Sequence, residues 1–170
     1  MDIWKYYDIT HKKHSDLNPM SKDKLDKLFL LLDLVPNSRV LDIGCGKGES
    51  LIRLVELFNI SGVGVDLSPY HSKDCKENIN KRVPSSDIKI LEMDGAKYKP
   101  TENETYDLSM CLGASWIYNG FKGTVKALKK MTKPEGLIIV GEPYWLKEPD
   151  GEYLKMSGIK KEEFNSHYKN

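Results

Sequence analysis

The sequence predicts a doubly wound α/β fold with a mostly parallel sheet. Two observations predict it: short apolar runs alternate with segments of helical periodicity, and the apolar runs end in Gly or Asp. Strands that alternate with helices favour a parallel sheet covered on both faces. The 170 residues suit one domain, and the 39% apolar and 30% charged residues are typical of a globular protein.

The first half of the chain supplies two strands and three helices. Ser21 is expected to cap a helix that runs to about Leu34 and is stopped by Pro36. A buried strand at 39–43 leads into a glycine-rich turn and a second helix. The next strand, at 62–65, ends at Asp66. Ser68 and Pro69 then form the N-cap and first position of a helix to about residue 83.

The second half continues the alternation. Strands are expected at 88–93, 106–112 and 137–140, with a helix near 121–128. Residues 134–136 read Pro-Glu-Gly and are expected to form a turn before the last of these strands. Ligands of parallel sheets bind at the carboxyl ends of the strands, so the residues that follow each strand are the candidate site.

The richest strand end reads Asp42-Ile43-Gly44-Cys45-Gly46-Lys47-Gly48-Glu49. Its glycines permit a tight turn, and the positive end of the following helix favours an anionic group. A dinucleotide fingerprint would require glycine at Glu49, and a P-loop would require Ser or Thr at Gly48. Neither motif is present. The plain alternative is a strand-to-helix turn without a ligand.

Three further strand ends carry suitable residues: Asp66-Leu67, Asp94-Gly95-Ala96 and Cys111-Leu112-Gly113. A carboxylate at Asp66 can accept two hydrogen bonds from a ribose diol, which serves several nucleotide cofactors. The alternatives are that Asp66 caps the helix that begins beside Ser68, and that Asp94 belongs only to an Asp-Gly turn.

The order acid-x-Gly-x-Gly-x-Gly, followed by these three strand ends, resembles the class I S-adenosylmethionine (SAM) dependent methyltransferases. The resemblance covers residues 39–141 and implies a Rossmann-like fold, SAM as cofactor and S-adenosylhomocysteine (SAH) as its product. It assigns the loop to the methionine moiety, Asp66 to the ribose and Asp94 to the adenine amine. The residues that it implies for cofactor binding are Asp42, Gly44, Cys45, Gly46, Gly48, Asp66, Leu67, Asp94, Gly95, Ala96, Cys111, Leu112 and Gly113.

Two later segments narrow the resemblance. Residues 113–117 read Gly-Ala-Ser-Trp-Ile and residues 141–145 read Gly-Glu-Pro-Tyr-Trp, as in a prokaryotic branch of small-molecule methyltransferases near the ubiquinone and menaquinone type. The implied function is methyl transfer from SAM to a small molecule. The alternatives are a SAM- or SAH-binding module without catalysis and an NAD-dependent oxidoreductase.

The acceptor side is expected to use aromatic and ionisable residues near the N-terminus and after the last two strands. The candidates are Tyr6, Tyr7, His11, His14, Trp116, Tyr118, Glu142 and Tyr144. As catalytic residues we predict Glu142, Tyr144 and His14, with Glu142 as the base that removes a proton from the acceptor. His11 and His14 resemble a metal-binding pair only superficially, and no metal site is expected.

The chain is expected to divide into an N-terminal lid segment (1–20), a SAM-binding domain (21–145) and a C-terminal helical segment (146–170). The antiparallel hairpin that closes the family's sheet is not recognisable, so the strand at 137–140 would present an exposed apolar edge. We therefore predict either a homo-oligomer formed across that edge or a marginally stable protein.

Besides the small-molecule acceptor and a second copy of the chain, no nucleic-acid or membrane partner is expected. A net charge of +1 gives no strong attraction to nucleic acid or to a membrane surface. Three scattered cysteines and an N-terminus without signal-peptide features predict a cytoplasmic protein.

Overall fold

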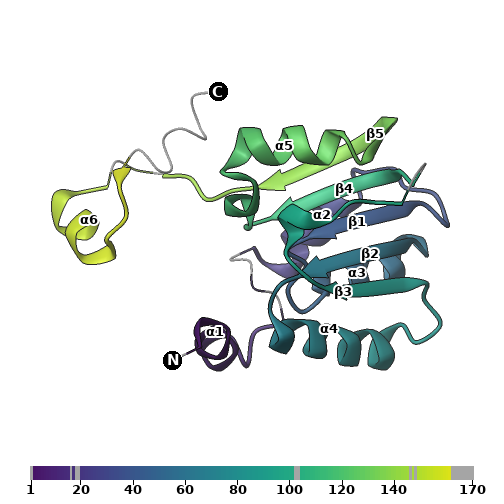
Figure 1. Cartoon of the computed structure of the whole chain (residues 1–170), viewed down its shortest axis with the longest axis horizontal. Helices are drawn as coiled ribbons and strands as arrows, with labels where there is room; N and C mark the ends of the chain where they lie inside the picture. The colour runs from purple at the N-terminus through teal and green to yellow at the C-terminus, as the bar shows by residue number, and fades with distance from the viewer. Residues whose placement is uncertain are drawn as a thin grey trace.

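A five-stranded parallel sheet forms the centre of the protein (Figure 1). The computed structural model describes residues 2–15, 17, 20–101, 104–145, 147 and 149–161. The strands lie in the order β3-β2-β1-β4-β5, and every neighbouring pair is parallel. The strands are β1 (Arg39–Ile43), β2 (Ser61–Asp66), β3 (Ile88–Glu92), β4 (Tyr106–Leu112) and β5 (Thr132–Gly141). The predicted doubly wound α/β class is confirmed.

Helices connect the strands and cover the sheet. The α-helices are α1 (Ile3–Thr10), α2 (Lys22–Phe29), α3 (Glu49–Phe58), α4 (Pro69–Arg82), α5 (Phe121–Lys129) and α6 (Gly151–Ser157). Two short 3₁₀ helices, η1 (Gly95–Lys97) and η2 (Ser115–Tyr118), follow β3 and β4. Figure 1 shows α1 beside the start of α4 and α6 standing away from the sheet.

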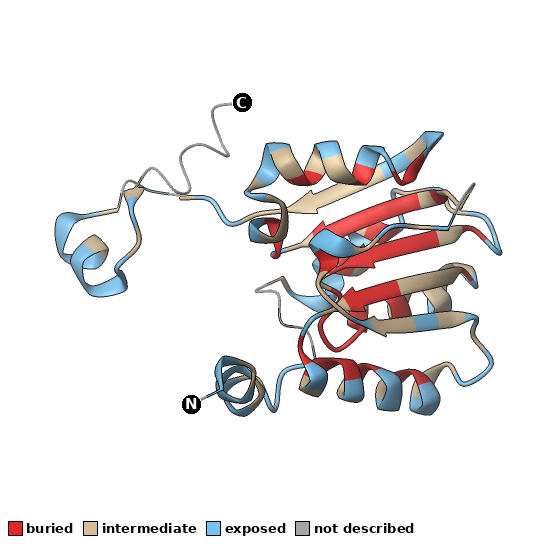
Figure 2. Ribbon diagram, in the orientation of Figure 1, coloured by how far each residue is buried: buried red, intermediate tan, exposed pale blue. Residues whose placement is uncertain are grey.

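Alternation along the central strands divides the core into two layers. Val40 of β1 packs with Leu25 of α2 and Leu51 of α3 on one face. Its neighbour Leu41 packs with Leu128 of α5 on the other. This period of two is expected for a strand buried on both sides. Figure 2 accordingly shows the buried residues concentrated in β1 and β4.

The start of α4 follows the sequence prediction closely. The Ser68 hydroxyl accepts a hydrogen bond from the backbone N–H of His71, and Pro69 occupies the first turn. This geometry satisfies one of the unpaired N–H groups at the helix start. It also fixes the position of α4 relative to the end of β2.

The helix predicted for 21–34 is shorter than expected. It ends at Phe29, and Asp33 adopts a left-handed backbone conformation with φ of 50°. The reason lies in burial, because Leu25 and Phe29 reach the core while Leu30 and Leu31 are 62% and 81% exposed. Leu30 and Leu31 therefore gain no burial beyond the end of the helix, whereas Leu32 and Leu34 pack against the core after the chain has left the helix.

The turn predicted at 134–136 is wrong. These residues lie inside β5, where Tyr106 pairs with Thr132 and Leu108 pairs with Leu137. Two positions along β4 thus correspond to five along β5, which defines a bulge. β5 is an outer strand of the described sheet, and such a strand tolerates Pro134 because the missing N–H removes no ladder bond.

Of the C-terminal segment predicted for 146–170, residues 147 and 149–161 lie within the described part of the chain, and the rest lie outside it. The predicted helix is present as α6, but none of its residues is buried. Tyr153 stacks edge-on against Trp145 at a centroid distance of 5.7 Å, and Met156 is 83% exposed. Among the residues described, no helix combines the length and apolar character needed to cross a bilayer.

Candidate functional site

The glycine-rich loop joins β1 to α3 with three residues in left-handed conformations. Gly44, Gly46 and Gly48 have φ angles of 75°, 52° and 80°. The backbone N–H groups of Gly44 and Cys45 both donate to the carbonyl of Val65 in β2, at 2.8 and 3.1 Å. The loop is therefore anchored to the neighbouring strand as it turns.

Close packing also requires glycine in this loop. A Cβ atom at Gly44 would lie 2.6 Å from the Cβ of Ala114, which follows β4. A Cβ at Gly48 would lie 2.3 Å from the Sγ of Cys75 in α4. Both distances are far below van der Waals contact, so the loop is held between the β4 end and α4.

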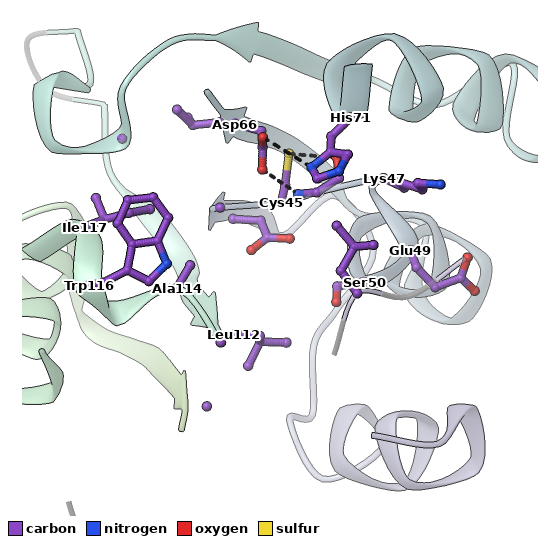
Figure 3. Close-up of a pocket in the computed structure, with 18 of the residues that line it drawn as sticks. Cys45, Lys47, Glu49, Ser50, Asp66, His71, Leu112, Ala114, Trp116 and Ile117 are labelled. Carbon is purple, nitrogen blue, oxygen red and sulfur yellow. Dashed lines mark hydrogen bonds and ion pairs between the residues drawn. The ribbon is translucent and has the colours of Figure 1, made fainter. Parts of the chain in front are cut away.

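Asp66, at the end of β2, binds the loop directly. One carboxylate oxygen accepts from the Gly46 N–H at 2.8 Å (Figure 3). The other accepts from the Ser68 N–H at 2.9 Å. The N-cap of α4 is Ser68, and Asp66 accepts a hydrogen bond from the N–H of this cap residue. Each carboxylate oxygen retains acceptor capacity, so the same residue can also bind a ligand.

His71 lies beside Asp66 and was not predicted from the sequence. Its Nδ1 lies 3.9 Å from an Asp66 oxygen, and its Nε2 is buried without a hydrogen-bond partner among the described residues. Burial lowers the pKa of His71, and the nearby Asp66 carboxylate opposes that change. A neutral imidazole therefore faces the same region as the Asp66 carboxylate.

Lys47 connects the loop to the N-terminal segment, and its role was also missed. Its side chain is 5% exposed, and its Nζ donates to the backbone carbonyls of His11 and Lys12 at 3.0 and 3.4 Å. An ion pair with Asp74 of α4, at 3.2 Å, completes its contacts. A Cβ at Gly46 would lie 2.9 Å from Leu17, so the segment that follows α1 also packs on the loop.

The end of β3 forms a capped turn. Asp94 accepts a hydrogen bond from the Ala96 N–H at 2.9 Å, as the turn alternative predicted. Tyr118 of η2 donates its hydroxyl to the Gly95 carbonyl at 2.8 Å and joins the ends of β3 and β4. Burial, with weaker effects of nearby ionisable groups, raises the pKa of the Tyr118 hydroxyl to about 12, so it stays protonated at neutral pH.

The two cysteines predicted near the cofactor are packing residues. Cys45 and Cys111 are buried, and no disulfide involves them. Burial raises the pKa of the Cys111 thiol to about 12, assisted by the negative charge of Asp42. The pKa of Cys45 is also raised, by its contact with Cys75 and by burial. Neither thiol is a thiolate at neutral pH, which excludes a nucleophilic role.

One cavity of about 1180 Å³ collects the strand ends and the N-terminal segment. Most residues predicted to bind the cofactor line it. These are Asp42, Gly44, Cys45, Gly46, Asp66, Leu67, Asp94, Gly95, Leu112 and Gly113. Gly48, Ala96 and Cys111 lie outside the lining. Gly48 and Ala96 belong to the turns after β1 and β3, whereas Cys111 is buried inside β4.

The predicted acceptor residues divide into two groups. Tyr7, His11, Trp116, Glu142 and Tyr144 line the cavity, whereas Tyr6, His14 and Tyr118 do not. His14 is exposed, and its Nδ1 lies 3.1 Å from the Nδ1 of His11. Of the three predicted catalytic residues, Glu142 and Tyr144 therefore line the cavity, and His14 does not.

Figure 3 shows how the cavity is arranged. Asp66, Cys45 and His71 lie together on one side, and Lys47 and Glu49 lie near them. Trp116 and Ile117 face this group from the opposite side. The polar strand ends of β1 and β2 thus face an aromatic wall that follows β4.

Comparisons with known proteins agree with this geometry. The profile of the methyltransferase domain matches residues 40–136. The uncharacterized protein YjhP of Escherichia coli K12 is 34% identical over 154 residues, which cover 91% of this chain and 61% of YjhP.

Two solved structures have the same fold, and each match covers slightly more of this chain than the YjhP match does. A SAM-dependent methyltransferase from Thiobacillus denitrificans, in complex with SAH, has a TM-score of 0.84 and 35% identity. The match covers 93% of this chain and 63% of that protein. A SAM-dependent methyltransferase from Geobacter sulfurreducens, also in complex with SAH, has a TM-score of 0.84 and 30% identity, covering 92% and 62% of the two chains. The chain thus spans about three fifths of the length of these relatives.

Proposed function

The chain belongs to the methyltransferase-domain family, and from this premise we propose that it transfers a methyl group from SAM to a small-molecule acceptor. The observation that carries the proposal is the direct link between the glycine loop and Asp66, made by the Gly46 N–H at 2.8 Å. That hydrogen bond joins the loop predicted to bind the methionine moiety of SAM to the carboxylate predicted to bind its ribose. The finer placement near the quinone-modifying enzymes stays a prediction.

The residues present fit the cofactor. The left-handed loop lacks side chains where a Cβ would collide with its neighbours, and it precedes the N-terminus of α3. Such a site favours the carboxylate of an amino acid. Asp66 retains acceptor capacity for hydroxyl groups, and the orphaned Nε2 of His71 lies nearby. Asp94 and Gly95 line the adjoining end of β3.

The chemistry divides between the cofactor and the chain. SAM supplies a methyl group that its positively charged sulfur already activates. The residues of this chain hold the reactants in line and exclude water, which supplies much of the rate enhancement in such displacements. Glu142 accepts the proton of the acceptor, because it lines the cavity and one of its oxygens has no hydrogen-bond partner among the residues described. Tyr144 follows it on the same segment.

Titration calorimetry with SAH and with SAM tests the binding step. We expect both to bind and NAD to give no heat. The variant Asp66→Asn replaces an acceptor by a donor facing backbone N–H groups, and we expect it to weaken SAH binding about tenfold to a hundredfold. Asp87→Asn is the matched control, since Asp87 is an exposed carboxylate just before β3.

Three results would contradict parts of the proposal. Absence of heat with SAH from a folded protein contradicts it entirely. Tighter binding of NAD than of SAH would favour the oxidoreductase alternative. Binding of SAM with no methylated product from any metabolite pool, detected by mass spectrometry, would favour a binding module without turnover.

A further inference from the structure

We propose that the acceptor is an amine, which the protein binds as an ammonium ion between aromatic rings and the Glu142 carboxylate. The inference rests on the proposed function and names its substrate class. Its starting point is the cavity volume of about 1180 Å³, which exceeds the roughly 300–1,000 Å³ typical of a site for one small ligand. The strand ends of β1, β2 and β3 take one part of it, and the remainder needs a second occupant.

Aromatic side chains from three segments line the same cavity. Trp4 and Tyr7 lie one turn apart on α1, with ring centroids separated by 6.5 Å, and both line the cavity. Trp116 of η2 and Tyr144 after β5 line it as well. Tyr7, Trp116 and Tyr144 are 41%, 64% and 54% exposed, so their faces are accessible to a ligand. Trp and Tyr faces attract cations through their ring quadrupoles.

The charges favour a cationic ligand in this part of the cavity. Glu142, just after β5, lines the cavity, and its buried Oε1 has no hydrogen-bond partner among the described residues. A buried carboxylate oxygen without a partner costs free energy that an N–H donor would recover. The Oε1 of Glu49 likewise has no hydrogen-bond partner among the described residues, but its Oε2 accepts from Arg82, so the charge of Glu49 is already paired with a cation.

Nearby lysines do not neutralise Glu142. Two lysines line the cavity, Lys47 and Lys24. The Lys47 ammonium is committed to Asp74 and to two backbone carbonyls. Lys24 is exposed on α2, where its ammonium is hydrated. An anionic acceptor would therefore meet Glu142 without a dedicated cation to balance it.

An amine acceptor also suits the movement of charge in the reaction. Glu142 first takes the ammonium proton, which leaves a neutral amine with a free lone pair. The lone pair forms the new nitrogen–carbon bond, and the electrons of the broken carbon–sulfur bond remain on sulfur. Positive charge thus moves from sulfur to nitrogen, where aromatic faces stabilise it.

Three probes of similar shape and different charge test the inference on SAH-loaded protein: 2-phenylethylamine, 2-phenylethanol and phenylacetate. At neutral pH they are a cation, a neutral molecule and an anion. We expect calorimetry to show the amine binding about tenfold more tightly than the alcohol, and phenylacetate binding most weakly. Glu142→Gln should abolish the preference for the amine. Trp116→Leu, at an exposed position, should reduce amine affinity about threefold to tenfold.

The matched control is Glu135→Gln, which removes an exposed carboxylate from the same strand that leads to Glu142. It should keep the preference of the unmodified protein. Equal or tighter binding of the alcohol or the anion overturns the inference, as does binding of none of the probes or a preference that survives Glu142→Gln. SAH binding is measured first in each sample. Failure of SAH to bind overturns both proposals, whereas SAH binding without amine preference overturns only this one.

Discussion

Single side chains in this protein serve the fold and the site at the same time. Asp66 satisfies the N–H groups of Gly46 and Ser68, at 2.8 and 2.9 Å, and so holds both the loop and the start of α4. Because a carboxylate accepts about four hydrogen bonds, these two do not exhaust it. The structural and ligand-binding interpretations of Asp66 are therefore compatible, and the loop geometry depends on the residue proposed to bind the ribose.

The sequence predicted the backbone side of the site better than its side chains. Gly44, Gly46 and Asp66 were identified from the order of glycines after β1 and the acid at the end of β2, which resemble the family's motif. Lys47 and His71 were missed, because a lysine in a glycine loop and a histidine in a first helical turn usually face solvent. Lys47 is buried where it bonds the N-terminal segment, and no local pattern indicates where that segment folds.

The buried His71 makes stability depend on pH. Its pKa lies below the ordinary value of 6.5, because burial disfavours the imidazolium. Between these two values the unfolded chain binds more protons than the folded one, so the free energy of unfolding rises with pH there. The full stability is present above about pH 6.5 and decreases as pH falls from there to the folded-state pKa.

Urea unfolding at about pH 7.5 and about pH 5.5 measures this effect. We expect the loss of stability on acidification to be smaller in His71→Gln than in the unmodified protein, since glutamine does not titrate. The control is His14→Gln, at an exposed position outside the cavity. An identical loss in all three proteins would show that the His71 pKa is not shifted by folding.

At the scale of elements, regular strands were predictable and their irregularities were not. The strands at 39–43 and 106–112 match β1 and β4 at both ends, because runs of apolar residues buried on both faces are unambiguous. The bulge in β5 was not predicted, since Pro-Glu-Gly is a typical turn sequence and only its pairing with β4 keeps it in the sheet. The end of α2 depended likewise on which leucines find a partner.

The position of α1 depends on Lys47. None of the side chains of α1 is buried, so apolar packing does not hold the helix firmly. The Lys47 ammonium bonds the carbonyls of His11 and Lys12 at its C-terminal end, where a positive charge is also favoured by the helix dipole. This end is consequently the anchor of the segment that carries Trp4 and Tyr7.

The variant Lys47→Met removes this anchor while keeping the length of the side chain. We expect amide hydrogen exchange in residues 3–14 to become about tenfold faster, because charged hydrogen bonds contribute roughly 1.5–3 kcal/mol. Exchange in β1 and β4 should not change. Lys73→Met, at a lysine whose side chain is 76% exposed, is the control. Unchanged exchange in residues 3–14 of Lys47→Met would show that α1 is held by other contacts.

At the scale of the whole molecule, the outer strand β5 offers a surface on which two copies of the chain can pair. β5 follows β4 at one end of the order, and no described strand pairs with its other side. Its outer residue Leu137 is 41% exposed. An unpaired apolar edge is a template for another strand. The homo-oligomer predicted from the sequence remains a proposal, and the structure supplies the surface on which it can be tested.

Sedimentation velocity over a range of concentrations tests this surface. We expect the mass to approach twice that of the monomer as concentration increases, and Leu137→Lys to remain monomeric, because a charge on an edge strand opposes pairing. The control is Met156→Lys, since Met156 is 83% exposed on α6, and this variant should still associate. A monomer at every concentration would contradict the prediction.

The Lys47 contacts also affect the sequence in which ligands bind. Lys47 belongs to the glycine loop, and its ammonium bonds the carbonyls that end α1. A ligand that immobilises the loop is therefore expected also to immobilise Trp4 and Tyr7, which line the cavity from α1. We expect steady-state kinetics of compulsory order, in which the donor enters first and its spent form departs last. Product inhibition by SAH would then be competitive against SAM and noncompetitive against the acceptor.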